Sequence, residues 1–226
     1  MICAVLFDLD DTLYPEAEFY RSGFAVAAEE LQRRGCGPAA AIRAVLEAIH
    51  FQQSRQGVFD AAAARLGFPA AWVPQLVALF HEHSPRIDLP AESARMLARL
   101  RPRYRLGIVT DGHAEVQRKK IRALGVASLV DAVVVADDLG REHWKPAPLA
   151  FLACCRALKV DPGQSVFVGD NPQRDMLGAR RAGIRGIRLR QGFFRDHDDA
   201  AWETPWGEIR GLEELETMLD RIAENV

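Results

Sequence analysis

Short runs of apolar residues recur along the chain and alternate with longer segments of mixed polarity. The runs lack the alternation of polar and apolar residues seen in a strand with one solvated face, which favours strands buried on both faces. Most of the intervening segments are long enough for a helix. This order predicts a doubly wound α/β fold with a parallel sheet. The predicted strands comprise residues 2–7, 105–110, 131–136, 164–169 and 184–189.

The segment after the first predicted strand departs from this order because it contains helical patterns only. Glycine and proline residues divide it into helices that we predict over residues 16–34, 38–53, 57–66 and 69–83. We therefore predict an all-helical domain over residues 14–88. It is inserted into an α/β core formed by residues 1–13 and 89–226, and the core ends in a predicted helix near residues 211–223.

Composition and charge exclude several classes of partner. The 29 lysines and arginines nearly balance the 31 aspartates and glutamates, so the net charge of -2 creates no global field that attracts nucleic acid. No stretch reaches the roughly 18 apolar residues of a membrane helix, and the N-terminus does not resemble a signal peptide. The four cysteines have neither zinc-site nor disulfide-framework spacing. We expect a cytoplasmic monomer or weak homodimer without nucleic-acid or membrane partners.

Charged and polar residues gather directly after four of the predicted strands. In an open parallel sheet, ligands bind beyond the carboxyl ends of the strands, so these residues are expected to converge. Several carboxylates in one crevice repel one another and require a cation. The clusters in chain order are Asp8 and Asp10, Thr110 with Asp111 and Gly112, Lys145, and Asp170 with Asp175.

The residue types in these clusters fit a metal and a phosphoryl group. Oxygen ligands suit a hard cation such as Mg²⁺, which binds through a few carboxylates together with a phosphate. Lys145 supplies a positive charge, and Thr110 supplies a hydroxyl donor for the remaining phosphoryl oxygens. A site that combines a metal, a lysine and a free carboxylate has the parts needed for attack on phosphorus.

Four short motifs resemble those of the haloacid dehalogenase-like (HAD) superfamily, and they occur in that family's order. The first is AVLFDLDDTLY over residues 4–14, and it is followed by IVTDG, HWKPAP and VGDNPQRD. The helical insertion between the first two motifs resembles the family's C1-type cap. The resemblance implies a Rossmann-like core and a Mg²⁺-dependent phosphatase.

The resemblance also implies a catalytic role for each matching residue. Asp8 is the nucleophile that attacks phosphorus and forms an aspartyl-phosphate. Asp10 is the acid that protonates the leaving oxygen and then the base that deprotonates the attacking water. Thr110 and Lys145 bind the phosphoryl oxygens and stabilise the transition state.

The implied metal site draws on the first and fourth motifs. Mg²⁺ is held by the Asp8 carboxylate, the main-chain carbonyl of Asp10 and the carboxylate of Asp170, with Asp175 in support. Thr12 is expected to serve the loop instead, by hydrogen-bonding its backbone.

The expected substrate is a small phosphorylated metabolite, such as a sugar phosphate or a nucleotide monophosphate. Candidate contacts are Arg21 and Arg55 in the insertion and Asp111 and Gly112 after the second strand. Residues 14–88 contain no lysine, which argues against the Schiff-base chemistry of phosphonate-cleaving members. Asp10 argues against a dehalogenase. A phosphomutase shares the catalytic residues, and a non-catalytic module that binds phosphorylated ligands is a second alternative.

Overall fold

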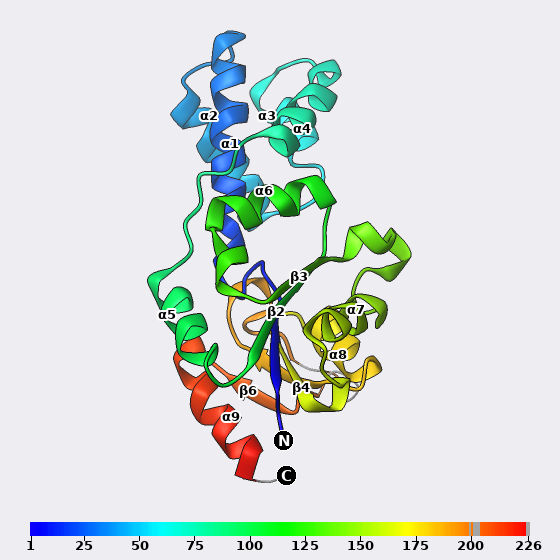
Figure 1. The fold of residues 1–226 in the computed structure, drawn as a ribbon. Helices are drawn as coiled ribbons and strands as arrows, with labels where there is room; N and C mark the ends of the chain where they lie inside the picture. Colours follow the sequence, from blue (N-terminus) through cyan, green and yellow to red (C-terminus); the bar gives the residue numbers. More distant parts are fainter. Residues whose placement is uncertain (199, 201–203, 225–226) are drawn as a thin grey trace. The chain divides into compact units, whose positions relative to one another are not determined.

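The computed structural model describes residues 1–198, 200 and 204–224, and the chain divides into two compact units. The core unit comprises Met1–Glu16 and Asp88–Val226, and the inserted unit comprises Ala17–Ile87. Figure 1 shows that the labelled strands belong to the core unit and that the inserted unit consists of helices and their connections. The function of the inserted unit as a cap stays a prediction.

The core unit is built on one sheet of six parallel strands in the order β3-β2-β1-β4-β5-β6. Ala4 of the central strand β1 pairs with Arg105 of β2 on one side and with Ser165 of β4 on the other. The predicted doubly wound parallel sheet is confirmed. The strands are β1 Ala4–Phe7, β2 Arg105–Thr110, β3 Ala132–Val135, β4 Ser165–Gly169, β5 Arg185–Leu189 and β6 Gly207–Ile209.

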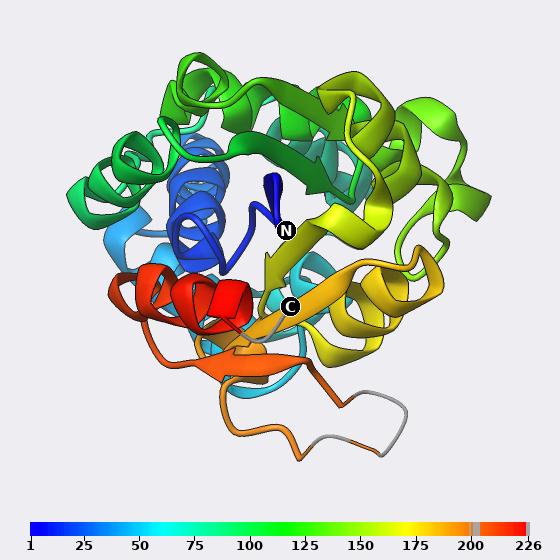
Figure 2. The ribbon, with the colours of Figure 1, turned by 60° about the horizontal axis from the view of Figure 1, so that its bottom comes forward.

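The edge strand β6 was not predicted from the sequence. It is only three residues long, and Ile209 is its one buried residue, so it lacks the apolar run that marks the other strands. Figure 2 shows β6 beside β5 at the edge of the sheet, where the two strands pair in parallel. Such a short edge strand exposes few unpaired backbone groups to another chain.

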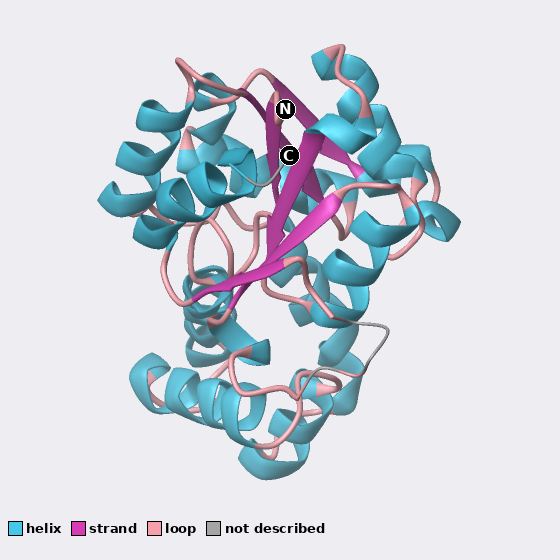
Figure 3. Ribbon diagram, turned by 90° about the horizontal axis from the view of Figure 1, so that it is seen from below, coloured by secondary structure: helices cyan, strands magenta, loops and turns pink. Residues whose placement is uncertain are grey.

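Helices cover both faces of this sheet (Figure 3). They are α5 Ala91–Leu100, α6 Ala114–Leu124, α7 Leu149–Leu158, α8 Leu177–Arg181 and α9 Leu215–Glu224. On one face Arg99 of α5 pairs with Glu216 of α9 at 2.8 Å, and on the other the Phe151 ring of α7 lies 4.7 Å from the Phe167 ring of β4. Across the described residues, none of the helices combines the length and apolar character needed to cross a bilayer.

The core depends on close contact between β2 and α7. Gly107 of β2 has no side chain at the point where Cys154 of α7 approaches the sheet, and a Cβ at this glycine would lie 2.5 Å from the Cys154 sulfur. Leu158 of α7 would lie 3.1 Å from the same Cβ. Because interiors are close-packed, the glycine allows α7 to seat directly on the strand.

The inserted unit contains the four predicted helices, α1 Glu16–Arg33, α2 Ala39–Gln52, α3 Val58–Leu66 and α4 Val73–Glu82. Gly67 ends α3 with a φ of +76°, a conformation that glycine adopts without strain. Aromatic rings fill the space between the helices, and the Phe80 ring lies 5.5 Å from Phe24 and 6.0 Å from Phe59. His50 belongs to the same cluster, with its ring 3.9 Å from that of Tyr20.

Replacing Gly107 by alanine tests the contact between strand and helix. We expect Gly107→Ala to lower the free energy of unfolding by about 1–3 kcal/mol, because the new methyl group overlaps with the Cys154 sulfur. The double variant Gly107→Ala/Cys154→Ala is expected to lose less free energy of unfolding than the sum of the losses in the two single variants. Thermal unfolding of the four proteins measures this coupling, and strictly additive losses would contradict the assigned contact.

We expect His50 to make the stability of the chain depend on pH. It is 2% exposed, and neither ring nitrogen has a hydrogen-bond partner among the residues that the structure describes. Burial and the nearby charge of Arg55 lower the pKa of His50 from 6.5 to about 4. The unfolded chain therefore binds a proton first as the pH falls, and stability decreases from about pH 6.5 towards pH 4.

We expect this effect to cost about 1–2 kcal/mol between about pH 7 and pH 5, at ~1.4 kcal/mol per pKa unit with a discount for solvent screening. The variant His50→Phe keeps an aromatic ring and removes the titrating group. Melting temperatures of both proteins across this pH range give the comparison. An equal fall in the two proteins would contradict the role of His50.

Candidate active site

The loop after β1 brings Asp8 to the carboxyl end of the sheet. The main-chain amide of Asp8 still donates to Val168 of β4 at 2.9 Å, so the residue is fixed by the central strand pairing. The chain then turns through Asp11, whose φ is +54° and whose carboxylate accepts a hydrogen bond of 2.9 Å from the Glu16 amide at the start of α1. The turn thus redirects the chain between Asp8 and the start of α1.

Three carboxylates meet next to this loop. Asp8, Asp170 and Asp175 are all buried, and one oxygen from each lies within 4.8 Å of the others. We call these residues the acidic cluster. Asp170 follows β4 directly, and Asp175 comes from the short π-helical segment Pro172–Met176. The strand order of the sheet therefore joins the first and fourth motifs, as the sequence predicts.

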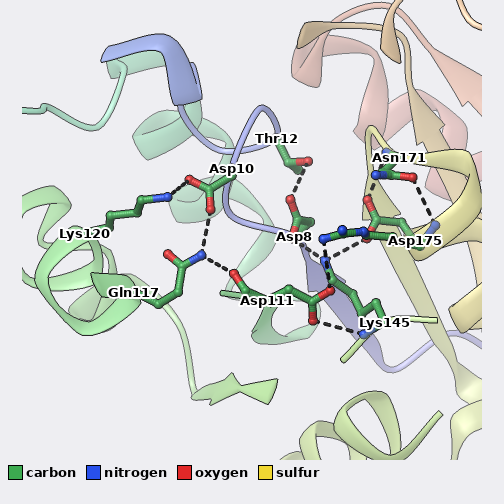
Figure 4. Close-up of polar contacts among 10 residues, drawn as sticks. Asp8, Asp10, Thr12, Asp111, Gln117, Lys120, Lys145, Asn171 and Asp175 are labelled. Atoms are coloured by element: carbon green, nitrogen blue, oxygen red, sulfur yellow. Dashed lines mark hydrogen bonds and ion pairs between the residues drawn. The ribbon is translucent and has the colours of Figure 1, made fainter. Parts of the chain in front are cut away.

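Lys145 is the cation that faces the acidic cluster (Figure 4). Its ammonium group donates to the Asp8 carboxylate and to Asp175 at 2.8 Å, and only 3% of its side chain is exposed. Burial opposes the charge of Lys145, but the adjacent Asp175 and Asp8 outweigh it and raise the pKa of the lysine. Lys145 is therefore a fixed positive charge beside the Asp8 carboxylate.

One lysine does not balance three buried carboxylates. Burial, followed by the charges of Asp175 and Asp8, raises the pKa of Asp170 to about 10. Burial also raises the pKa of Asp8, although Lys145 acts in the opposite direction. A divalent cation held between these oxygens would restore the ionised forms. The donor set fits a hard cation, since it consists of carboxylate oxygens on separate loops.

The loop after β4, which carries the fourth motif, holds Asp175 in place through hydrogen bonds. The Asn171 amide donates to the Asp175 carboxylate at 3.0 Å, and the Asp175 amide donates back to the Asn171 carbonyl at 2.8 Å. The Asn171 side chain accepts hydrogen bonds from the amides of Gln173 and Arg174, which caps the segment. A Cβ on Gly169 would overlap with the Asp175 carboxylate, so the glycine makes room for it.

The loop after β2 provides two buried oxygen atoms, one from Thr110 and one from Asp111, that have no hydrogen-bond partner among the residues the structure describes. Thr110 is fully buried, and its hydroxyl oxygen lacks such a partner within the described chain. Asp111 accepts a hydrogen bond of 3.1 Å from the Lys145 amide through one oxygen, and its other oxygen lies 3.8 Å from the Arg174 guanidinium. Burial raises the pKa of Asp111, with Lys145 opposing. Buried hydroxyls are normally paired, so Thr110 is available for a ligand oxygen.

Asp10 points towards α6 instead of joining the acidic cluster (Figure 4). Its carboxylate accepts hydrogen bonds from Lys120 at 2.7 Å, Gln117 at 2.8 Å and Tyr14 at 2.5 Å. Burial opposes ionisation, but the Lys120 charge and these hydrogen bonds outweigh it and lower the pKa of Asp10. Although each carboxyl group contacts a lysine, the pKa of Asp8 is raised and that of Asp10 is lowered.

The other predicted residues have different surroundings. Gly112 has a φ of +118°, and a Cβ there would lie 2.9 Å from the Gln117 amide nitrogen, so this glycine makes room for Gln117. Arg21 and Arg55 belong to the inserted unit, where their guanidinium groups lie over the rings of Phe51 and Tyr20. All three stay candidates for substrate contact.

Sequence reasoning missed the partners of Asp10 on α6. Gln117 and Lys120 are three residues apart and therefore share a face of the helix after the second strand, which is the available signal. The expectation for Thr12 was wrong, because its hydroxyl donates to the Asp8 carboxylate at 3.5 Å. The carboxylate of Asp8 competes as an acceptor with the loop backbone, and charged acceptors bind more strongly.

The residues that carry the four motifs match a known protein family. A family model described as a haloacid dehalogenase-like hydrolase matches residues 2–183, which contain all four motifs. The chain belongs to the haloacid dehalogenase-like hydrolase family. The resemblance of the motifs is thereby confirmed, and this HAD-family hydrolase has its acidic cluster where the first and fourth motifs meet.

Proteins similar to this chain are named either as phosphatases or as a dehalogenase. The chain is 33% identical over 221 residues to a glyceraldehyde 3-phosphate phosphatase of Methanopyrus kandleri, with 87% of each chain covered. It is 30% identical over 206 residues to a phosphoserine phosphatase of Thermus thermophilus, covering 88% of this chain and 80% of the relative. Among solved structures, a 2-haloacid dehalogenase from Pseudomonas syringae pv. Tomato shares 30% identity with a TM-score of 0.65, covering 98% of this chain and 99% of that one.

Removing the Lys145 ammonium tests the electrostatic balance of this HAD-family site. We expect Lys145→Met to lower the free energy of unfolding by about 3–5 kcal/mol in metal-free buffer, because Asp8 and Asp175 lose their buried partner. Lys159→Met, at an exposed position, is the matched control. Thermal unfolding provides the measurement, and a loss in Lys145→Met no larger than in the control would contradict the assigned ion pairs.

Proposed function

We propose that the chain is a Mg²⁺-dependent phosphatase that hydrolyses a small phosphorylated metabolite through an aspartyl-phosphate on Asp8. The observation that carries this proposal is the buried contact of Lys145 with Asp8 beside Asp170 and Asp175. It unites a nucleophile, a fixed positive charge and oxygen ligands in one place. The names of the two phosphatase relatives support the same reaction class.

In the first step, an Asp8 oxygen attacks phosphorus and the bond from phosphorus to the leaving oxygen breaks. The electron pair of that bond goes to the leaving oxygen, which takes a proton from Asp10. Lys145 and the Thr110 hydroxyl bind the other phosphoryl oxygens, where they stabilise the charge of the transition state.

In the second step, water attacks the phosphorus of the aspartyl-phosphate. The bond from phosphorus to the Asp8 oxygen breaks, its electron pair returns to Asp8, and a proton of the water passes to Asp10. Phosphate leaves, and Asp8 is again a carboxylate. The hydrogen bond from Thr12 and the contact with Lys145 hold Asp8 in one orientation throughout.

The acidic cluster would hold the metal. Asp8 and Asp170 offer carboxylate oxygens, Asp175 supports them, and the main-chain carbonyl of Asp10 is the further ligand that we propose. When bound there, Mg²⁺ would offset the charge of the carboxylates and reduce the repulsion between the Asp8 carboxylate and the phosphoryl oxygens. The raised pKa of Asp170 is consistent with a site that is completed by a cation.

We further propose that the inserted unit is a cap that selects the leaving group. Sugar phosphates and nucleotide monophosphates are the expected classes, and Arg21, Arg55, Asp111 and Gly112 are the proposed contacts. A closed cap would also exclude bulk water from the aspartyl-phosphate.

The alternatives differ in measurable products. A phosphomutase transfers the phosphoryl group to another hydroxyl, so that its product keeps phosphate. A binding module would take up phosphorylated ligands without turnover. A dehalogenase would release halide from a 2-haloacid, as the name of the similar Pseudomonas structure suggests for that protein.

Phosphate release from p-nitrophenyl phosphate and a metabolite panel tests the proposal. We expect Mg²⁺-dependent turnover by the wild type, loss in EDTA, and a loss of about 10⁴-fold or more in Asp8→Asn, because an amide is a poor nucleophile. Asp138→Asn, an exposed change in the same unit, serves as control. Halide release from 2-chloropropionate without phosphate release would favour a dehalogenase, and ligand binding without turnover would favour the module.

A further inference from the structure

Asp10 accepts hydrogen bonds from three side chains of the core unit that are almost completely buried. Lys120 and Tyr14 donate to one carboxylate oxygen, at 2.7 and 2.5 Å, and Gln117 donates to the other at 2.8 Å. The exposed fractions of Lys120, Gln117 and Tyr14 are 3%, 3% and 1%. Figure 4 shows two of these donors, on α6, converging on Asp10 from the side away from Asp8.

The burial of Lys120 requires an explanation. A buried ammonium group is costly unless it is paired, and apolar residues usually stabilise a helix contact at least as well as an ion pair. The Lys120 ammonium group lies 2.7 Å from a carboxylate oxygen of Asp10 and 3.8 Å from one of Glu16. The nearer partner is the residue to which the proposed function assigns the proton transfers.

Gln117 connects Asp10 to the loop after β2. The same amide nitrogen that donates to Asp10 also donates to the main-chain carbonyl of Asp111. Gly112 leaves space for it, since a Cβ there would lie 2.9 Å from that nitrogen. The amide therefore fixes the distance between the first and second loops of the site.

The three hydrogen bonds leave one lone-pair site of the Asp10 carboxylate unused by these donors. An ionised carboxylate has about four lone-pair sites, and three are already used. The remaining site can take a proton from water, while rotation of the carboxylate is prevented by donors on both oxygens. A base that is fixed in this way needs no reorientation when water attacks.

We propose that Lys120, Gln117 and Tyr14 are positioning residues that hold Asp10 as the base for hydrolysis of the phosphoenzyme. The inference rests on the proposed function. In the step concerned, water attacks phosphorus, the bond to the Asp8 oxygen breaks with its electron pair returning to Asp8, and the water proton goes to Asp10. The three donors contact the Asp10 carboxylate and act through it; the step assigns them no contact with the phosphoryl group or the attacking water.

The test separates the two steps with p-nitrophenyl phosphate and Mg²⁺ in a rapid-quench experiment. Nitrophenolate leaves without protonation, so formation of the phosphoenzyme does not need Asp10. In Lys120→Met we expect hydrolysis of the phosphoenzyme to slow roughly 10–100-fold. kcat and KM then fall together, kcat/KM stays near the wild-type value, and a burst of nitrophenolate precedes slow turnover. Acid-quenched protein should carry phosphate on Asp8.

Three further variants complete the design. Lys119→Met removes the same charge from a side chain that leaves α6 about 100° away, and it should behave as the wild type. Lys120→Arg keeps a charged donor and should recover part of the hydrolysis rate. In an Asp10→Asn background, Lys120→Met should add little, because a residue that acts through Asp10 has nothing left to position.

Several results would overturn the inference. One is an unchanged rate of phosphoenzyme hydrolysis in folded Lys120→Met, and another is an equal loss from this change in the Asp10→Asn background. A parallel fall of kcat and kcat/KM without phosphoenzyme would indicate a structural role only. If Lys120→Met does not fold, Gln117→Leu and Tyr14→Phe are judged by the same criteria. A wild type without phosphoenzyme and without phosphate release would refute the proposed function itself, and the inference with it.

Discussion

The contact between the Lys145 ammonium and the buried carboxylates of Asp8 and Asp175 is the interaction on which the rest of the site depends. Three carboxylates gathered in a protein interior repel one another, and burial penalises their charge further. The lysine offsets part of this cost, and a divalent cation would offset the remainder. This uncompensated negative charge is the reason that we propose a metal ion as part of the site.

Backbone geometry serves this electrostatic arrangement. Parallel strands in the order β3-β2-β1-β4 place the first, second and fourth loops at one end of the sheet, and the loop after β3 delivers Lys145. Gly169 leaves room for the Asp175 carboxylate, and Gly112 leaves room for Gln117. Asp10, two residues after Asp8, faces the donors on α6, and the pKa values of these two aspartates are shifted in opposite directions.

The sequence was most informative where a physical pattern repeats. Buried parallel strands are continuous apolar runs, so β1 to β5 and the sheet could be predicted, whereas β6 has three residues and no run. The acidic cluster could be predicted because its aspartates follow predicted strands of one parallel sheet. Lys120 and Gln117 could not be assigned because contacts between α6 and Asp10 depend on tertiary packing, which one sequence does not display. The cytoplasmic location and the monomer or weak homodimer stay predictions.

A crystal structure of the protein with Mg²⁺ and beryllium trifluoride, a stand-in for a phosphoryl group, tests the central claim most directly. We predict an adduct on the Asp8 carboxylate, with the Lys145 ammonium on one of its fluorines and the cation in contact with Asp8 and Asp170. An adduct on a different side chain would contradict this account of the site. So would a cation bound away from the acidic cluster.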